Sequence, residues 1–341
     1  MNNAPLAGTL ARLTEANIPA TREALGLSAD PSLSALPMAG SDRYYWRVRL
    51  PNGTTCVLSQ HEGKRPENAR FVPLARFLGQ HGVRVPIILA EDHANHRIWL
   101  EDLGDTSLES LASSGHPACQ AGYLATIAAL AKLHAISQDQ AMALEPRLQP
   151  AFTSSLYRWE QDYFWDHYGA RHSGLTPDHI GELRRHPALL ELAEDLAGHP
   201  RCLVHRDCQS QNILIQADGG AALIDFQGMR YGLAEYDLAS LFYDPYVALP
   251  ESQRDALFAE YHRLRQSDRT VSQRLLAGCA IQRLMQALGA YANLADNLGK
   301  SWYLKFIPIA TERLRRIVAT HPVAAALLPA LPEADTAPST L

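Results

Sequence analysis

Sequence patterns typical of β-strands are concentrated in the first hundred residues of this 341-residue chain. Two β-rich runs, RYYWRVRL from residue 43 and TTCVLS from residue 54, flank Pro51-Asn52-Gly53, and Asn-Gly tolerates the positive φ of a tight hairpin turn. Apolar residues at helical spacing predict helices over 4–17 and 66–80. The runs IILAE and RIWLE predict two more strands. This part of the chain should form a small, sheet-rich lobe.

The pattern after residue 105 is mostly helical, with helices expected over 106–112, 119–136, 154–168, 182–197, 236–241, 252–265, 272–298 and 302–319. A single predicted hairpin interrupts the helices, with strands at 213–215 and 222–224 around an Asp-Gly turn. We therefore predict an α+β protein of two lobes. Residues 1–101 form the small β-rich lobe, residues 102–332 the larger helical lobe, and residues 333–341 a frayed tail. This order of lobes is that of a protein-kinase-like fold.

Composition excludes several other classes of protein. A formal charge of −5 and a pI near 6.3 provide no electrostatic footprint for nucleic acid or an anionic membrane surface. No apolar run approaches the roughly 18 residues of a membrane helix, and the N-terminus lacks the pattern of a signal peptide. The five cysteines form no CxxC pair, which argues against a zinc site. We expect a cytoplasmic protein with reduced thiols, and the sequence leaves its oligomeric state open.

The stretch LVHRDCQSQNILI, residues 203–215, combines functional groups that a simple turn does not need. Its His205-Arg206-Asp207 followed by Asn212 matches the catalytic-loop pattern H-R-D-x-x-x-x-N, and Asp225 closes the next strand. Asp207 would accept the proton of an acceptor hydroxyl, and Asn212 and Asp225 would offer oxygen ligands to Mg²⁺. The pattern predicts phosphoryl transfer from ATP, with a structural role for His205.

The segment LVHRDCQSQNILI…ALIDFQGMRYGLAEYDLASLF resembles the aminoglycoside phosphotransferase family of kinase-like small-molecule kinases, with Asp237 on the characteristic helix-start Asp. Four further segments are similar to bacterial kinases that phosphorylate the anomeric hydroxyl of N-acetylmuramate and N-acetylglucosamine in cell-wall recycling. They are AGSDRYYWRV (39–48), LEDLGD (100–105), LASLFYDPYV (238–247) and QRLMQALGAYANLADNLGKSWYL (282–304). The resemblance covers most of residues 35–315.

The resemblance implies a nucleotide site in the small lobe. Its residues would be a turn over the phosphates, Gly40, Ser41, Asp42 and Arg43, and a hinge whose backbone meets adenine, Glu101, Asp102 and Leu103. The chain departs from the usual kinase pattern because Ser59 stands where a phosphate-binding lysine is typical. Either the site is catalytically inactive, or Arg43 or Lys64 supplies the missing charge.

The acceptor should approach Asp207 from the helical lobe. The candidate residues mix amide, cationic and anionic groups suited to a small-molecule sugar, and they are Gln209, Arg230, Asp244 and Arg283. A polycationic acceptor is disfavoured because DFQGMRYGLAEYD is mixed in sign. The alternatives are a kinase for another small alcohol, such as choline, homoserine or an aminoglycoside, and a nucleotide-binding regulatory pseudokinase. Gly299-Lys300-Ser301 ends like a P-loop, but position 294 is Leu and no strand precedes it.

Overall fold

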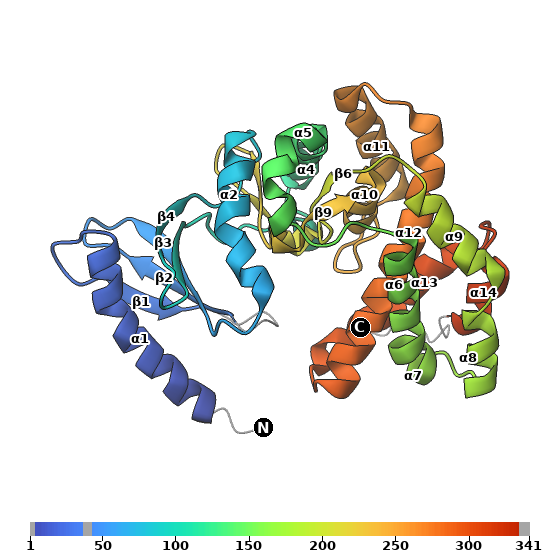
Figure 1. Ribbon diagram of the computed structural model, residues 1–341, viewed down its shortest axis with the longest axis horizontal. Coiled ribbons are helices and arrows are strands. Elements are labelled where there is room, and N and C mark those ends of the chain that lie inside the picture. Colours follow the sequence, from blue (N-terminus) through green and yellow to red (C-terminus); the bar gives the residue numbers. More distant parts are fainter. Residues whose placement is uncertain (1–3, 37–42, 334–341) are drawn as a thin grey trace.

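The computed structural model describes residues 4–36 and 43–333, which form two lobes (Figure 1). Gly40, Ser41 and Asp42 lie outside the described residues. The elements of the smaller, N-terminal lobe are α1 (Ala4–Ala24), β1 (Ser32–Ala35), β2 (Arg43–Arg49), β3 (Thr55–His61), α2 (Phe71–Gln80), β4 (Ile88–Asp92) and β5 (Arg97–Glu101). The strands form one antiparallel sheet in the order β1-β2-β3-β5-β4. The predicted lobe order and the α+β class are confirmed.

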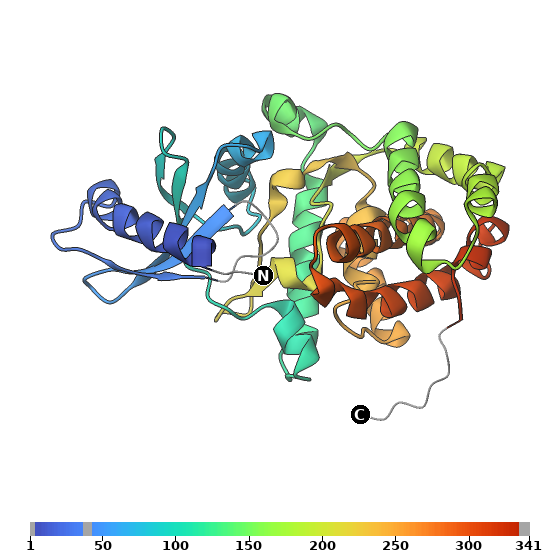
Figure 2. The ribbon, with the colours of Figure 1, turned by 90° about the horizontal axis from the view of Figure 1, so that it is seen from below.

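The two helices of the N-terminal lobe cover opposite faces of its sheet (Figures 1 and 2). On the α1 face, Trp46 donates its indole N–H to Thr14 Oγ1 at 2.8 Å, and Trp99 donates to Thr21 Oγ1 at 3.0 Å. These bonds lie along a helix that continues to residue 24, whereas the apolar pattern predicted an end at residue 17. A contact made by a polar residue such as Thr21 does not contribute to an apolar periodicity, so the last part of the helix was not recognised in the sequence. The edge strand β1, which pairs with β2, was not predicted because it has only four residues, Ser-Leu-Ser-Ala, and these are mostly exposed.

The α2 face of the sheet meets the helical lobe. Apolar residues of α2, including Leu74 and Leu78, belong to the same buried core as the large lobe, and Phe71 stacks on Phe226 with ring centroids 4.8 Å apart. Leu223 N–H also donates to Arg84 O at 2.9 Å. The predicted boundary at residue 101 coincides with the end of β5, but packing and hydrogen bonds cross from one lobe to the other there.

The larger lobe is mainly helical. Its helices are α3 (Leu108–Ser113), α4 (Cys119–Ala135), α5 (Gln138–Ala141), α6 (Ser154–Phe164), α7 (Ala170–His172), α8 (Pro177–Arg184), α9 (Pro187–Ala197), α10 (Ala234–Phe242), α11 (Glu251–Arg265), α12 (Arg269–Ala292), α13 (Phe306–Val318) and α14 (Ala324–Leu327). Its strands are β6 (Cys202–Val204), β7 (Ile213–Ile215), β8 (Ala221–Leu223) and β9 (Arg230–Gly232). The long helix α12 passes through the core, where most of its residues are buried.

Several elements of this lobe differ from the sequence-based expectations; for example, the short helices α5 and α14 were not predicted. The helix predicted over 182–197 is two helices, because Pro187 begins α9 and His186 caps it by accepting from the amide of Ala188. The strand β9 was not predicted; it pairs with β6 and places Arg230 opposite Val204. A side chain at Gly232 would put its Cβ 2.7 Å from the Phe152 ring, so this strand requires glycine there. Among the described residues, no helix is both long and apolar enough to cross a membrane.

Candidate active site

Asp237, a fully buried residue of the first turn of α10, holds the loop between β6 and β7 in place through hydrogen bonds. Its carboxylate accepts hydrogen bonds from the backbone N–H groups of His205, at 2.6 Å, and Arg206, at 2.7 Å. His134 Nε2 lies 3.1 Å from the same carboxylate. The backbone of Arg206 has φ +79°, a left-handed conformation that residues other than glycine rarely adopt. The two bonds to Asp237 stabilise this strained backbone immediately before Asp207.

His205 is buried and links the loop to the following hairpin. Its Nε2 lies 2.9 Å from the carbonyl oxygen of Ile224, the residue before Asp225. This contact is the bracing role predicted for the histidine. The contact ties the position of Asp207 to that of Asp225, because Asp207 lies two residues after His205 and Asp225 directly follows Ile224.

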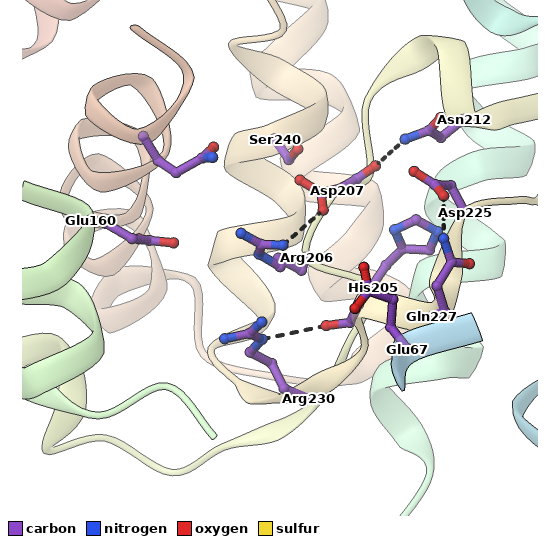
Figure 3. Close-up of polar contacts among 12 residues, drawn as sticks. Glu67, Glu160, His205, Arg206, Asp207, Asn212, Asp225, Gln227, Arg230 and Ser240 are labelled. Carbon is purple, nitrogen blue, oxygen red and sulfur yellow. Dashed lines mark hydrogen bonds and ion pairs between the residues drawn. The ribbon is translucent and has the colours of Figure 1, made fainter. Parts of the chain in front are cut away.

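Asp207 lies at the junction of the two lobes, beside Arg206 (Figure 3), and it contacts two arginines. Its Oδ1 is 3.3 Å from Arg283 Nη2, and its Oδ2 is 3.4 Å from Arg206 Nη1. The side chain remains 28% exposed. Burial alone would raise the pKa of this carboxyl, but the charges of Arg206 and Arg283 outweigh burial and hold the pKa below its usual value. Asp207 is therefore an ionised hydrogen-bond acceptor that a ligand can reach.

Asn212 and Asp225 present oxygen atoms on the other side of Asp207 (Figure 3). Asn212 donates its side-chain N–H to the carbonyl oxygen of Asp207 at 2.8 Å, which leaves its amide oxygen as an acceptor. Asp225 is partly exposed, has φ +62°, and accepts from the Gln227 side chain. Among the described residues, no cluster of three or more His, Cys, Asp or Glu could enclose a metal. One carboxylate and one amide suit Mg²⁺, which is usually held by few protein ligands together with waters and substrate phosphates.

The main cleft between the lobes has a volume of about 600 Å³, within the range of small-molecule sites. Residues from both lobes line it, including Arg43, Tyr45, Arg47, Val57, Arg65, Glu67, Leu100, Glu101, Asp102, Leu103, Asp207, Asn212, Asp225 and Gly228. The predicted hinge, catalytic and metal residues thus share one cleft. Arg65 and Glu67 were missed because they lie just before and at the start of the predicted helix over 66–80, where no motif marks them as site residues.

Arg43 is the better placed of the two candidate cations. Its Nη1 lies 3.4 Å from Asp225 Oδ1, and its Nε donates to Asn68 Oδ1 at 2.7 Å. Lys64 is 73% exposed, pairs with Glu62, and does not line the cleft. Ser59, at the usual lysine position, is buried within β3. The positive charge on the N-terminal side of the cleft therefore comes from arginine.

The hinge segment is held by ion pairs that the sequence analysis did not identify. Arg47 of β2 contacts Asp102 at 2.8 and 3.2 Å and Asp105 at 2.6 and 2.7 Å. Arg84 contacts Glu101 at 2.7 Å, and the backbone N–H of Glu101 donates to Ile87 O at 2.9 Å. That amide is thus used within the sheet, which leaves it unavailable to a nucleotide base. Only the fold brings these charges together, since Arg47 and Asp102 are 55 residues apart.

The four acceptor candidates have different environments. Arg283 contacts Asp207, and Arg230 lies near it with its Nε 3.4 Å from Gly228 O. Gln209 is buried just beyond Asp207. The Asp244 carboxylate is also buried and accepts from Ser210 N–H at 2.8 Å, from the Ser210 hydroxyl at 2.5 Å and from Tyr246 N–H at 3.1 Å. Because the chain itself satisfies Asp244, the structure favours a role in holding the catalytic loop over the predicted contact with an acceptor.

Comparison with known proteins agrees with this arrangement. The profile of the family described as "APH: Phosphotransferase enzyme family" matches residues 33–271. A Pseudomonas aeruginosa protein named N-acetylmuramate/N-acetylglucosamine kinase is 29% identical over 317 residues, with 87% of each chain covered. Its counterpart of the same name from Pseudomonas putida is 25% identical over 304 residues, covering 87% of this chain and 86% of that protein.

A solved structure shows the same fold at lower sequence similarity. The choline kinase LicA from Streptococcus pneumoniae superposes with a TM-score of 0.59 at 14% identity, covering 90% of this chain and 99% of that chain. The family profile spans most of the chain, including the loop of Asp207 and the hairpin that leads to Asp225. The protein therefore belongs to the phosphotransferase enzyme family.

Proposed function

We propose that this phosphotransferase uses ATP and Mg²⁺ to phosphorylate the anomeric hydroxyl of N-acetylmuramate or N-acetylglucosamine. The main observation behind the proposal is the position of the ionised Asp207 carboxylate. Arginine side chains lie on one side of it, and the oxygen atoms of Asn212 and Asp225 lie on the other. The names of the relatives support the choice of sugar. A place in the recycling of cell-wall sugars in the cytoplasm rests on the resemblance.

In this proposal Asp207 orients the acceptor hydroxyl and receives its proton during in-line attack on the γ-phosphate. Asn212 and Asp225 would hold Mg²⁺, which neutralises developing phosphate charge when bound. Arg43 would contact the phosphates from the N-terminal lobe, in the role that a strand lysine has in other kinases. The backbone of Asp102 and Leu103 would meet the adenine, with the carboxylate of Asp102 held away by Arg47.

The charges around Asp207 also bear on the alternatives. Arg206, Arg230 and Arg283 all act on this carboxylate, and such a surrounding is unfavourable for cationic acceptors such as choline or an aminoglycoside. A regulatory pseudokinase is disfavoured because the arginine at position 43 lies inside the cleft and contacts Asp225.

The test is ADP release by the purified full-length protein with ATP and Mg²⁺, using N-acetylmuramate, N-acetylglucosamine, choline, homoserine and kanamycin as acceptors. We expect turnover with the amino sugars, and NMR of the product should show phosphate on the anomeric carbon. Turnover restricted to choline, homoserine or kanamycin would overturn the sugar assignment. ATP binding without turnover of any acceptor would favour the pseudokinase.

A further inference from the structure

Three arginines surround one side of Asp207. Arg206 comes from the catalytic loop, Arg230 from β9 and Arg283 from α12, and the charge of each lowers the pKa of the Asp207 carboxyl. In Figure 3, Arg206 and Arg230 lie on the side of Asp207 toward Glu160, a residue of α6, whereas Asn212 and Asp225 lie on the other side. These guanidinium groups are therefore separated from the oxygen atoms assigned to Mg²⁺ and the nucleotide.

The cluster carries more positive than negative charge. Burial and the charge of Arg206 lower the pKa of the buried Arg230 to about 10, and the carboxyl groups with the largest opposing effect are Glu160 and Asp207. Glu160 is fully buried, which raises its pKa, and it accepts from the Tyr236 hydroxyl at 3.0 and 3.2 Å. Within the part of the chain that the structure describes, no ion pair joins Glu160 to an arginine. At least one guanidinium charge is left without a counter-charge.

Arg230 is the arginine whose charge is least compensated. Its side chain is 7% exposed, and its guanidinium lies 5.1 Å from the centre of the Phe152 ring. Its Nε has one long hydrogen bond, 3.4 Å to Gly228 O, and its two terminal nitrogens have no acceptor among the described residues. A buried cation without an acceptor is costly unless a ligand supplies the missing negative charge. In Figure 3 the guanidinium points toward Arg206 and Asp207.

We infer that Arg230, with Arg206, binds a carboxylate on the same acceptor molecule whose hydroxyl lies at Asp207. A planar guanidinium matches a carboxylate with two parallel hydrogen bonds, and the anion would relieve the repulsion between the two arginines. The inference rests on the proposed function. It distinguishes between the two sugars, because N-acetylmuramate is N-acetylglucosamine with an added lactic acid ether and therefore carries the carboxylate.

The experiment compares kcat/KM for N-acetylmuramate, its neutral methyl ester and N-acetylglucosamine. The wild-type protein should prefer the acid over the ester. In Arg230→Gln, the ratio of kcat/KM for acid over ester should fall roughly 30-fold, since losing one partner of a buried charge pair has effects of this size. Arg230→Lys should retain part of the preference, because it keeps the charge without the planar geometry. Arg316→Gln, an exposed change on α13, should leave the ratio as in the wild type.

Three outcomes would overturn the inference. The first is a wild-type protein that does not distinguish acid from ester, a result that needs no variant and no assumption about folding. The second is an unchanged ratio in a folded Arg230→Gln. The third is a rise in the KM for ATP in that variant without a change in the ratio, which would place Arg230 at the phosphates.

Failure of the proposed function can be recognised separately. If no sugar is turned over, calorimetric titration with N-acetylmuramate and with its methyl ester still tests the carboxylate site directly. Binding of the acid that is lost in Arg230→Gln would support the site, whereas equal binding by both proteins, or no binding of the acid by the wild type, would overturn it.

Discussion

The two sides of the cleft are constructed differently. On the N-terminal side, the cleft residues are held by ion pairs near the surface, such as Arg47 with Asp102 and Asp105, and Asp105 is largely exposed. On the C-terminal side, the catalytic loop rests on the buried carboxylates of Asp237 and Asp244, which accept backbone N–H groups. Exposed pairs are weakened by water and salt, whereas buried charged hydrogen bonds are costly to break.

This difference assigns separate physical tasks to the two sides. A nucleotide can be bound by surfaces that adjust by small amounts, and short exposed ion pairs permit such adjustment. The acceptor hydroxyl must lie at a defined distance from a carboxylate with a controlled charge, and a buried network provides that control. Loss of a C-terminal support should therefore cost more than loss of an N-terminal one.

The largest expected effect is the loss of the Asp207 carboxylate. In Asp207→Asn the side chain keeps its shape but cannot accept a proton, so kcat should fall by roughly 10²- to 10⁴-fold in the ADP-release assay. Thermal unfolding should occur at a lower temperature than in the wild type, because the buried Arg283 loses its carboxylate partner, so kcat is compared at a temperature where both proteins are folded. Turnover within a few-fold of the wild type would contradict the assignment of Asp207 as the proton acceptor.

The next effect concerns the buried support of the loop. Asp237→Ala removes the acceptor for the amides of His205 and Arg206, so the free energy of unfolding should fall by about 3 kcal/mol, with a parallel loss of kcat. Urea denaturation would measure the change, and Asp255→Ala on the exposed surface of α11 is the matched control. A stable but inactive Asp237→Ala would show that the support positions the loop without stabilising the fold.

A smaller effect is expected when Arg43, the cationic residue proposed to contact the ATP phosphates, is replaced. Arg43→Ala should raise the KM for ATP by about 10-fold, with a smaller change in the KM for the sugar, because it removes one charged contact to phosphate. Lys64→Ala serves as the matched control, since that lysine lies outside the lining of the cleft. The assignment fails if Lys64→Ala raises the KM for ATP more than Arg43→Ala does.

The smallest effect is expected for the ion pairs of the hinge. Arg47→Met should lower the free energy of unfolding by about 1 kcal/mol at low salt, and by less at 0.5 M salt, where partly exposed pairs are screened. Urea denaturation at both salt concentrations measures this. A loss equal to that of Asp237→Ala would remove the contrast between the two sides of the cleft.

Local sequence patterns were enough to predict the order of the lobes and the chemical groups of the catalytic loop. Alternating strands around Asn52-Gly53, helical periodicity after residue 105, and the spacing of Asp207, Asn212 and Asp225 are local patterns that depend only on neighbours along the chain. The same kind of pattern indicated Arg43 as a candidate residue of the nucleotide site. It did not indicate Asn68, the residue that accepts a hydrogen bond from Arg43.

The support and the electrostatic surroundings of those groups depend instead on contacts between distant parts of the chain. The contacts of Asp237 with His134, of Arg47 with Asp102, and of Arg283 with Asp207 join residues 55 to 103 positions apart in sequence. Burial encloses Asp244 beneath the catalytic loop and leaves the Arg230 guanidinium with one long hydrogen bond, and it is likewise a property of the packed molecule. Local patterns do not encode these distances, because they arise when separate elements meet around a common core.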